Sequence, residues 1–353
     1  VRWSSMPTVP AESLRSISRD IFEALGASSD DAGVVADVLV EANLAGHDSH
    51  GVIRVTQYCA SVRAGHTVPG AATTTIRETA TTTIHDAHWN FGPVAMSHAL
   101  ADGMDKARDL GMHAFGIHNC NHIGRLGHYS DAAARAGFVP MITVNSTGAG
   151  ASVAPHGGRH GRLGTNPFCV AFPTSDDPIL MDMTSSIVAE GKIRVRRNAG
   201  EELPEGWILA RHGNPSTNPE DFYGPPRGAI LPFGGPVAHK GFALSMMAEL
   251  LSGTLTGAGN VTERDGHIGN GVFCLLLDVG AFRGEEEFRG AASRLGAYVK
   301  DCEPADGADE VLLPGEPEHR ARHSRSASGI VVDDTTWQGL CAEAERVGLP
   351  TPR

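Results

Sequence analysis

One eight-residue stretch organises the sequence: His47-Asp48-Ser49-His50-Gly51-Val52-Ile53-Arg54. Glycines at positions 46 and 51 bracket its reactive part, which predicts a loop that leads into a helix. If the residues after Gly51 are helical, Arg54 and Tyr58 lie four residues apart on one helix face, and His50 sits above that face at the helix entrance. The stretch therefore gathers an imidazole, a hydroxyl and a fixed cation in one place.

These residue types suit acid–base chemistry on a carboxylate substrate. An arginine can hold a carboxylate through two parallel hydrogen bonds. A histidine, whose ordinary pKa lies near neutrality, can give a proton to an oxygen on which negative charge develops. Reduction of a 2-oxo acid needs both groups. In the plainer interpretation Ser49 caps a helix and both histidines are ordinary polar loop residues, since short motifs often match by chance.

Length and composition set outer bounds. The 353 residues predict two or three domains, or one large body with an inserted lobe. The net charge of -12 argues against a general nucleic-acid binder, and no apolar run is long enough to cross a bilayer. The six cysteines are scattered without a Cys-x-x-Cys pair, so we expect reduced thiols in a cytoplasmic protein. The N-terminus lacks the apolar core of a signal peptide, and we expect the native start at Met6.

Hydrophobic periodicity predicts helices first and alternating strands and helices afterwards. Three helices are expected in the N-terminal part, at 8–27, from Asp30, and from the signature stretch to Gly65. Strands are expected at Thr73–Ile76, Thr81–Ile84, Met112–Ile117, Val139–Val144, Phe168–Phe172, Ile179–Met183 and Val272–Asp278. Further helices are expected at Gly92–Asp109, Ser130–Ala136, from Ser185, at Lys240–Ser252, Glu285–Lys300 and from Thr335. Gly200–Gly235 is rich in Pro, Gly and Asn and predicts a long excursion over the surface.

The common nucleotide-binding fingerprints are absent from this sequence. Neither Gly-x-Gly-x-x-Gly between a strand and a helix nor a P-loop is present. Three other stretches could hold a nucleotide: Asn121–Gly127, where backbone amides at a helix entrance lie beside Arg125; Met181–Thr184, at a strand end; and His239–Gly241, a cation at a helix start. Each is also an ordinary turn or cap pattern.

A metal site is a further possibility, because the chain has 17 histidines. Pairs such as His118/His122 and His156/His160 are spaced like ligands, but His-Glu-x-x-His and other tight metal signatures are missing. So many histidines produce such spacings by chance, and we expect no metal.

A series of blocks resembles the malate/L-lactate/sulfolactate dehydrogenase family, whose members do not use a Rossmann fold. The blocks are, in chain order, His47–Arg54, Asn121–Gly127, Leu163–Pro167, Met181–Ser185, Glu205–Trp207, Gly213–Pro215, His239–Phe242 and Pro314–Glu316. The run Ala189–Val195 most resembles the branch that contains hydroxycarboxylate dehydrogenase B. The resemblance implies an α/β, sulfolactate-dehydrogenase-like fold with a helical N-terminal domain and a mixed-sheet cofactor domain. We expect the helical part at 7–75, the cofactor domain at 76–300, and a C-terminal segment, 301–353, that returns to the first domain.

The same resemblance implies an oxidoreductase that uses NAD or NADP on 2-hydroxy/2-oxo carboxylates. It implies a homodimer with the site in a cleft between the two domains, and no nucleic-acid or membrane partner. By similarity, Ser49 and His50 form a proton relay with His50 as donor, Arg54 clamps the substrate carboxylate, and Thr165, Glu190 and Gly191 lie at the substrate. The dinucleotide contacts would be His122, Ile123, Gly124, Arg125, Leu126, Asp182, Met183, Thr184, His239, Lys240, Pro314, Gly315 and Glu316. In some members the equivalent of His122 transfers the proton, so His122 is a second candidate for that role.

One position departs from the imine-reducing branch of the family, where an aspartate completes the relay. Here that position is Lys192, which carries only donors and cannot orient the relay by accepting a hydrogen bond. Lys192 could instead steady a developing alkoxide or a second carboxylate, or it could pair with Glu190 or be solvated.

We therefore expect hydride transfer to carbon 2 of a 2-oxo acid, with reduction of a cyclic imine as one alternative and a histidine-rich metallohydrolase as another. The choice between NAD and NADP stays open, because Arg194, Arg196 and Arg197 could meet a 2′-phosphate or form a solvated basic face.

Overall fold

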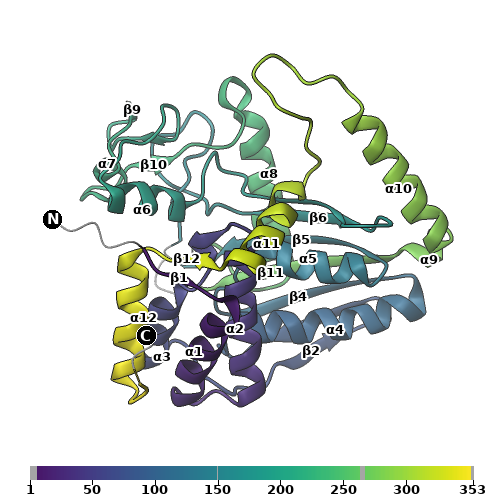
Figure 1. Cartoon of the computed structure of the whole chain (residues 1–353), viewed down its shortest axis with the longest axis horizontal. Coiled ribbons are helices and arrows are strands. Elements are labelled where there is room, and N and C mark those ends of the chain that lie inside the picture. Colours follow the sequence, from purple (N-terminus) through teal and green to yellow (C-terminus); the bar gives the residue numbers. More distant parts are fainter. Residues whose placement is uncertain (1–5, 149, 263–266, 351–353) are drawn as a thin grey trace.

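A seven-stranded sheet forms the centre of the molecule in the computed structural model, which describes residues 6–148, 150–262 and 267–350 (Figure 1). The residues that precede the expected start at Met6 lie outside this range. The strand order is β2-β3-β4-β11-β5-β6-β7, and neighbouring strands are antiparallel except for the parallel pair β3-β4. The strands are β2 (Thr74–Glu78), β3 (Thr82–Asp86), β4 (Met112–Cys120), β5 (Phe138–Ser146), β6 (Phe168–Phe172), β7 (Ile179–Met183) and β11 (Asn270–Asp278). The seven predicted strands are these seven strands, and the mixed α/β fold class is confirmed.

Helices cover both faces of this sheet because its central strands are buried on both sides. Two neighbouring residues of β4 show the two faces, since successive side chains of a strand alternate. Phe115 packs against Gly103 of α4 (Gly92–Leu110), whereas Gly116 faces Thr256, next to the π-helix Leu250–Leu255 that extends α8 (His239–Glu249). α5 (Leu126–Arg135) packs on β5, β6 and β7 and shares the hydrophobic core of α4.

The N-terminal helices form a second core together with the end of the chain. This layer contains α1 (Ala11–Ala24), α2 (Ser29–Leu44), a 3₁₀ turn (Asp48–His50), α3 (Arg54–Arg63) and α12 (Asp334–Arg346). Ser28 and Asp333 cap α2 and α12 by accepting backbone N–H bonds three residues further on. β1 (Thr8–Val9) pairs with β12 (Ile330–Val331), which ties the C-terminal segment to the first residues described. The division at residues 75 and 300 stays a prediction.

A third, smaller core corrects the expectation for Gly200–Gly235. This segment is not a simple excursion, because β8 (Ile208–Leu209), β9 (Pro215–Ser216) and β10 (Ala229–Ile230) form a small sheet beside α6 (Glu190–Ala199) and α7 (Glu220–Tyr223). Its scattered apolar residues, among them Ile208, Phe222 and Ile230, are buried together with Ile193 of α6. α6 begins at Glu190 and not near Ser185, because Ser185 and Ser186 are held extended by bonds to Thr165 and Pro232.

The remaining helices are α9 (Val279–Phe282), α10 (Glu285–Lys300) and α11 (Glu316–Ser328). α10 is confirmed as predicted, whereas α11 was missed. Its 13 residues have no buried member, so α11 lacks the apolar stripe on which a sequence-based helix prediction depends. Its start has the usual signals, a proline in the first turn and acidic residues at the N-terminus. No helix in the described part of the chain is long and apolar enough to cross a membrane.

Candidate active site

A cleft of about 380 Å³ lies where the N-terminal helices meet the edge of the sheet that carries β5 and β7. The 3₁₀ turn, the β4–α5 connection, the ends of β5 and β7, and the segment before α6 form its walls. Twelve of the residues predicted for the site line it: Ser49, His50, His122, Ile123, Gly124, Arg125, Leu126, Thr165, Asp182, Met183, Thr184 and Lys192. The fold thus brings together blocks that are far apart in the sequence.

Two imidazoles stack inside this cleft, those of His50 and His122, with ring centroids 5.6 Å apart and an interplanar angle of 22°. Nδ1 of His50 lies 3.1 Å from Oγ of Ser49. Nδ1 of His122 lies 2.8 Å from the hydroxyl oxygen of Tyr58, which in turn donates to the backbone oxygen of His122 at 3.1 Å. Both bonds of Tyr58 are satisfied together only if Nδ1 of His122 carries the proton, because the phenol has one proton to give. Neutral His122 then has a bare Nε2, whereas the Ser49–His50 bond permits either tautomer.

Burial lowers the proton affinity of both rings. The pKa of His50 lies well below its usual range, because burial disfavours its charged form and because His122 and Arg54 lie nearby. Burial, reinforced by the charge of Arg54, lowers the pKa of His122 to about 3. Both imidazoles are therefore neutral at neutral pH.

Arg54 begins α3, shortly after the 3₁₀ turn, and is not among the residues that line the cleft. Its Nε donates to the backbone oxygen of Ser49 at 2.7 Å, and its Nη1 donates to the side chain of Gln57 at 2.6 Å. Within the described residues, Nη2 of Arg54 makes no hydrogen bond. The guanidinium is thus fixed through Nε, while one nitrogen is left for a ligand.

The start of α6 closes over this turn because position 191 is a glycine. A Cβ at Gly191 would lie 2.7 Å from Cβ of Ser49 and 3.7 Å from Nη2 of Arg54. Glu190, beside it, accepts hydrogen bonds from Arg194 and from the hydroxyl of Tyr223 at 2.7 Å. Glu190 therefore does not form the ion pair with Lys192 that the sequence allowed. Lys192 is exposed on the cleft wall and makes no ion pair with any described residue.

The entrance of α5 has the features of an anion site. Arg125 is 5% exposed, and its Nε has no hydrogen-bond partner in the described part of the chain, although the carboxylate of Asp182 lies 3.6 Å away. The same carboxylate accepts the backbone N–H of Gly127 at 2.7 Å. A buried, unsatisfied guanidinium at the N-terminus of a helix fits the diphosphate of a dinucleotide.

Several cleft residues escaped sequence reasoning, among them Asn145, Ser146, Phe233 and Asn270. Asn145 and Ser146 end β5, and Asn270 begins β11, so polar residues at the end of a buried strand were the available signal. Asn270 accepts the backbone N–H of Ile123 at 3.1 Å and donates to the backbone oxygen of Asn145 at 3.1 Å. This asparagine fixes the β4–α5 connection that carries His122 and Arg125.

Five predicted dinucleotide residues lie outside the cleft. His239 and Lys240 are exposed at the start of α8, where the ring of His239 lies 5.9 Å from that of His156. Pro314 and Glu316 line a second cavity of about 620 Å³, and Gly315 packs against Leu180 of β7. Across the described residues no group of three or more His, Cys, Asp or Glu side chains is arranged to hold a metal ion.

Comparison with known proteins gives this arrangement a family. The sequence profile described as malate/L-lactate dehydrogenase matches residues 9–341. The chain belongs to this family. It is 37% identical to hydroxycarboxylate dehydrogenase B of Escherichia coli K12 over 347 residues, which are 96% of this chain and 94% of that protein. The predicted family is confirmed, and the family is one of oxidoreductases.

Two solved structures agree with this assignment. Malate dehydrogenase from Entamoeba histolytica superposes with a TM-score of 0.93 at 25% identity, covering 98% of this chain and 99% of that one. Delta1-piperideine-2-carboxylate reductase from Pseudomonas syringae superposes with a TM-score of 0.83 at 30% identity, covering 96% and 100%. The metallohydrolase hypothesis has no support from these relatives.

Proposed function

We propose that the protein is an NAD(P)-dependent 2-hydroxycarboxylate dehydrogenase, which interconverts a 2-oxo acid and its 2-hydroxy acid. One observation carries the proposal: Arg54 is held beside the hydrogen-bonded Ser49–His50 pair, because its Nε donates to the Ser49 carbonyl. When bound, the nicotinamide ring supplies or accepts the hydride. The protein supplies placement, charge and a proton.

Arg54 holds the carboxylate of the substrate. Its free Nη2 and its Nη1, released from Gln57, form the fork that binds a carboxylate through two hydrogen bonds. Because Nε stays on the Ser49 carbonyl, the carboxylate is fixed relative to the proton donor, which lowers the entropic part of the barrier.

His50 delivers the proton to the substrate oxygen during reduction. With Ser49 donating to Nδ1, neutral His50 carries its proton on Nε2, gives it to the substrate and takes the serine proton at Nδ1. Ser49, half-buried at the cleft wall, is then reprotonated from water. His122 cannot act in this way, because its Nδ1 already carries the proton that it donates to Tyr58. It would have to donate as an imidazolium, which its pKa of about 3 disfavours.

The dinucleotide would lie along the wall formed by Ile123, Gly124, Arg125 and Leu126 on one side and by Asp182, Met183 and Thr184 on the other. Arg125 and the amides of α5 would hold its diphosphate. Thr165, Glu190 and Gly191 remain proposed substrate neighbours, and His239 and Lys240 remain proposed dinucleotide contacts. We further propose a cytoplasmic homodimer.

Cyclic imine reduction is the second candidate, favoured by the likeness to the piperideine-2-carboxylate reductase. Lys192 argues against it, because an ammonium cannot accept the hydrogen bond that would complete an acidic relay. A panel of 2-oxo acids and cyclic imines separates the two candidates, and we expect turnover of the 2-oxo acids.

A fluorescence titration with NADH and with NADPH, each with and without phenylpyruvate or 2-oxoglutarate, tests the proposed function. We expect tight binding of a dinucleotide, followed by its consumption when an oxo acid is present. Binding of neither dinucleotide would refute the proposal.

A further inference from the structure

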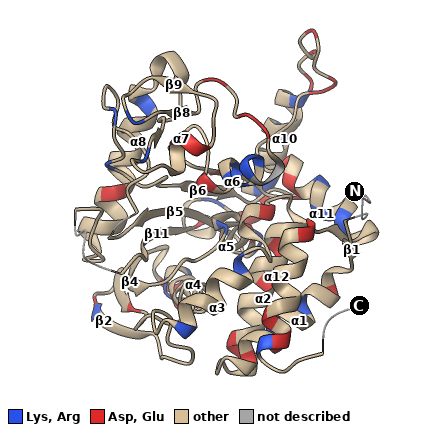
Figure 2. Ribbon diagram, turned by 90° about the vertical axis from the view of Figure 1, so that its left-hand side faces the viewer, with Lys and Arg blue, Asp and Glu red and all other residues tan. Residues whose placement is uncertain are grey.

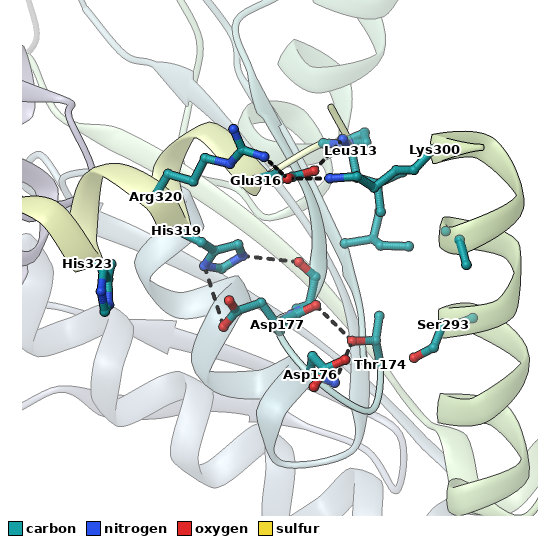
Figure 3. Close-up of a pocket in the computed structure, with 16 residues that line it drawn as sticks. Thr174, Asp176, Asp177, Ser293, Lys300, Leu313, Glu316, His319, Arg320 and His323 are labelled. Atoms are coloured by element: carbon teal, nitrogen blue, oxygen red, sulfur yellow. Dashed lines mark hydrogen bonds and ion pairs between the residues drawn. The ribbon is translucent and has the colours of Figure 1, made fainter. Parts of the chain in front are cut away.

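The second cavity lies on the outer side of β7, between the β6–β7 turn, α10 and the start of α11 (Figure 3). Its floor is apolar and includes Ile179, Ala297, Leu313 and Pro314. Position 296 on α10 is a glycine, and a Cβ there would lie 2.9 Å from the Leu313 side chain. Leu313 therefore packs directly on α10, and the floor is an apolar surface with charged residues around it.

The strand β7 connects this cavity with the catalytic cleft. Ile179 at one end lines the cavity, and Asp182 and Met183 at the other end line the cleft. Four residue steps of about 3.3 Å separate the two ends by about 13 Å. Between them, Arg125 of the cleft and His319 of the cavity line the same narrow space, which side chains fill. An extended dinucleotide with its nicotinamide in the cleft and its diphosphate at Arg125 would direct its adenosine towards the outer cavity.

The cations around this cavity already have partners. Lys300 and Arg320 both bond to Glu316 (Figure 3). Arg320 also bonds to Glu310. The hydrogen bond from Lys300 leads the effects that lower the pKa of Glu316 to about 2. Asp177, in the β6–β7 turn, is paired with Arg135 at 2.7 Å. Neither Lys300 nor Arg320 is left unpaired to receive a phosphate.

Asp176 is different, because its carboxylate has no hydrogen bond or ion pair to any described residue. Only its backbone takes part in the turn, donating to Oγ1 of Thr174 at 3.0 Å. The exposed segment 301–310, which follows α10, adds further negative charge, since it contains five Asp or Glu residues and no Lys or Arg (Figure 2). Among the charged groups that line the cavity, the carboxylate of Asp176 is therefore the one for which the described residues supply no partner.

The family resemblance places the dinucleotide at Pro314 and Glu316, which line this cavity, and we propose that Asp176, on the same cavity, makes the protein select NAD(H) over NADP(H). A carboxylate accepts a hydrogen bond from the 2′-hydroxyl of the ribose, as acidic residues do in other dinucleotide sites. The 2′-phosphate of NADP(H) would bring like charges together without a free cation to offset them. This selection rests on the proposed function, since it assumes that the cleft holds a nicotinamide.

The arginines that could have bound a 2′-phosphate support the same selection. Arg194, Arg196 and Arg197 belong to α6, and none of them lines this cavity. They pair with Glu190, Glu201 and Glu220, respectively. Because all three are paired with glutamates in or beside the third, smaller core, these arginines do not form a phosphate site.

Calorimetric titration of the full chain with NADH and with NADPH, in the absence of substrate, tests this selection. We expect the dissociation constant to be roughly tenfold or more lower for NADH, with the ratio shrinking at high ionic strength because salt screens the repulsion. Asp176→Asn should lower the ratio by tightening NADPH. Asp109→Asn, which removes the same charge from an exposed position on α4 outside the cavity, should leave the ratio unchanged.

Two results would overturn the inference while leaving the proposed dehydrogenase intact: NADPH binding as tightly as NADH, or a ratio that Asp176→Asn does not change. Binding of neither dinucleotide would overturn both the inference and the proposed function. Thermal unfolding of Asp176→Asn, at an exposed turn, is expected to match that of the parent protein, so that its binding data report on the cavity alone.

Discussion

The catalytic cleft and the outer cavity lie at opposite ends of β7 and handle charge in opposite ways. In the cleft, His50 and His122 are neutral because they are buried, and Arg125 keeps an unsatisfied nitrogen. At the outer cavity, the charged groups are half-buried or exposed, and Lys300 and Arg320 are already neutralised by carboxylates. Burial thus determines the protonation state of the two histidines where the chemistry would occur. Charge pairing determines the preference between NAD(H) and NADP(H) where the cofactor would be recognised. We therefore expect large effects from substitutions in the cleft and smaller effects at the outer cavity.

The largest effect is expected at the proposed proton donor. His50→Gln should lower kcat by roughly 10²- to 10⁴-fold, because in the proposed mechanism it removes the group that protonates the substrate oxygen. Ser49→Ala should lower kcat in the same direction, because it removes the hydroxyl that refills Nδ1. Steady-state reduction of a 2-oxo acid measures both.

His122→Gln is the matched control for His50, since the two rings stack on each other. Its kcat should fall less than that of His50→Gln. A larger loss in His122→Gln, with kcat of His50→Gln close to that of the parent protein, would transfer the donor role to His122.

The proposed substrate clamp, Arg54, should give the next largest effect. Arg54→Ala is expected to lower kcat/KM by roughly 100-fold or more, mainly through KM, because binding of a desolvated charge pair is lost. Arg54→Lys should recover little of it, since a lysine cannot form the two-pronged contact. Arg77→Ala, on the exposed strand β2, removes an arginine remote from the cleft and should leave kcat/KM unchanged. An unchanged KM in Arg54→Ala would contradict the clamp.

The approach of α6 to the signature turn should give a smaller, geometric effect. In Gly191→Ala, the new Cβ would lie 2.7 Å from Cβ of Ser49, so the serine or the helix must move. We expect kcat to fall roughly tenfold, and the free energy of unfolding to fall by about 1–3 kcal/mol from overpacking.

Gly33→Ala is the control for this substitution, because nothing lies within 4 Å of its new Cβ on α2. It should stabilise the helix by roughly 0.5–1 kcal/mol and leave kcat unchanged. Full activity in Gly191→Ala would show that the close approach of α6 has no part in positioning Ser49.

Stability should depend on pH through the buried histidines. Burial lowers the pKa of His85 to about 4 and that of His122 to about 3, whereas the unfolded chain takes up protons near pH 6.5. The unfolded state therefore binds more protons below pH 6.5, and the free energy of unfolding should fall as the pH drops from 6.5 towards 4. The slope is about 1.4 kcal/mol per pH unit for each such histidine. Urea unfolding at pH 7.5, 6 and 5 measures it.

The variant His122→Gln isolates one of these contributions. Its unfolding free energy should depend less steeply on pH than that of the parent protein between pH 6.5 and 4. A stability that stays constant over this range in the parent protein would mean that its histidines titrate normally in the folded state.

Much of this molecule could be predicted from its sequence, and the parts that could not share a physical reason. The central strands and the helices of the two main cores have strong apolar periodicity, so their positions followed from the pattern. α11 has no buried residue, and in Gly200–Gly235 the few apolar residues are scattered among prolines and glycines. Neither segment therefore has a periodic apolar pattern. Motifs in the sequence predicted many of the residues that line the cleft, but they could not predict contacts between positions that are distant in the sequence. Three contacts or their absence depend on the tertiary fold: the bond from Nδ1 of His122 to the Tyr58 hydroxyl, the pairing of Glu190 with Arg194, and the lack of a described partner for the Asp176 carboxylate.

The central claim is that a hydride passes to carbon 2 of a 2-oxo acid in this cleft. The most direct test is to supply NADH that carries deuterium at the transferred position and to locate the label in the product by NMR. We predict deuterium on carbon 2 of a single enantiomer of the 2-hydroxy acid, formed by the parent protein and far more slowly by His50→Gln. A 2-hydroxy acid without deuterium at carbon 2, or labelled NADH left unconsumed with every 2-oxo acid tried, would contradict it.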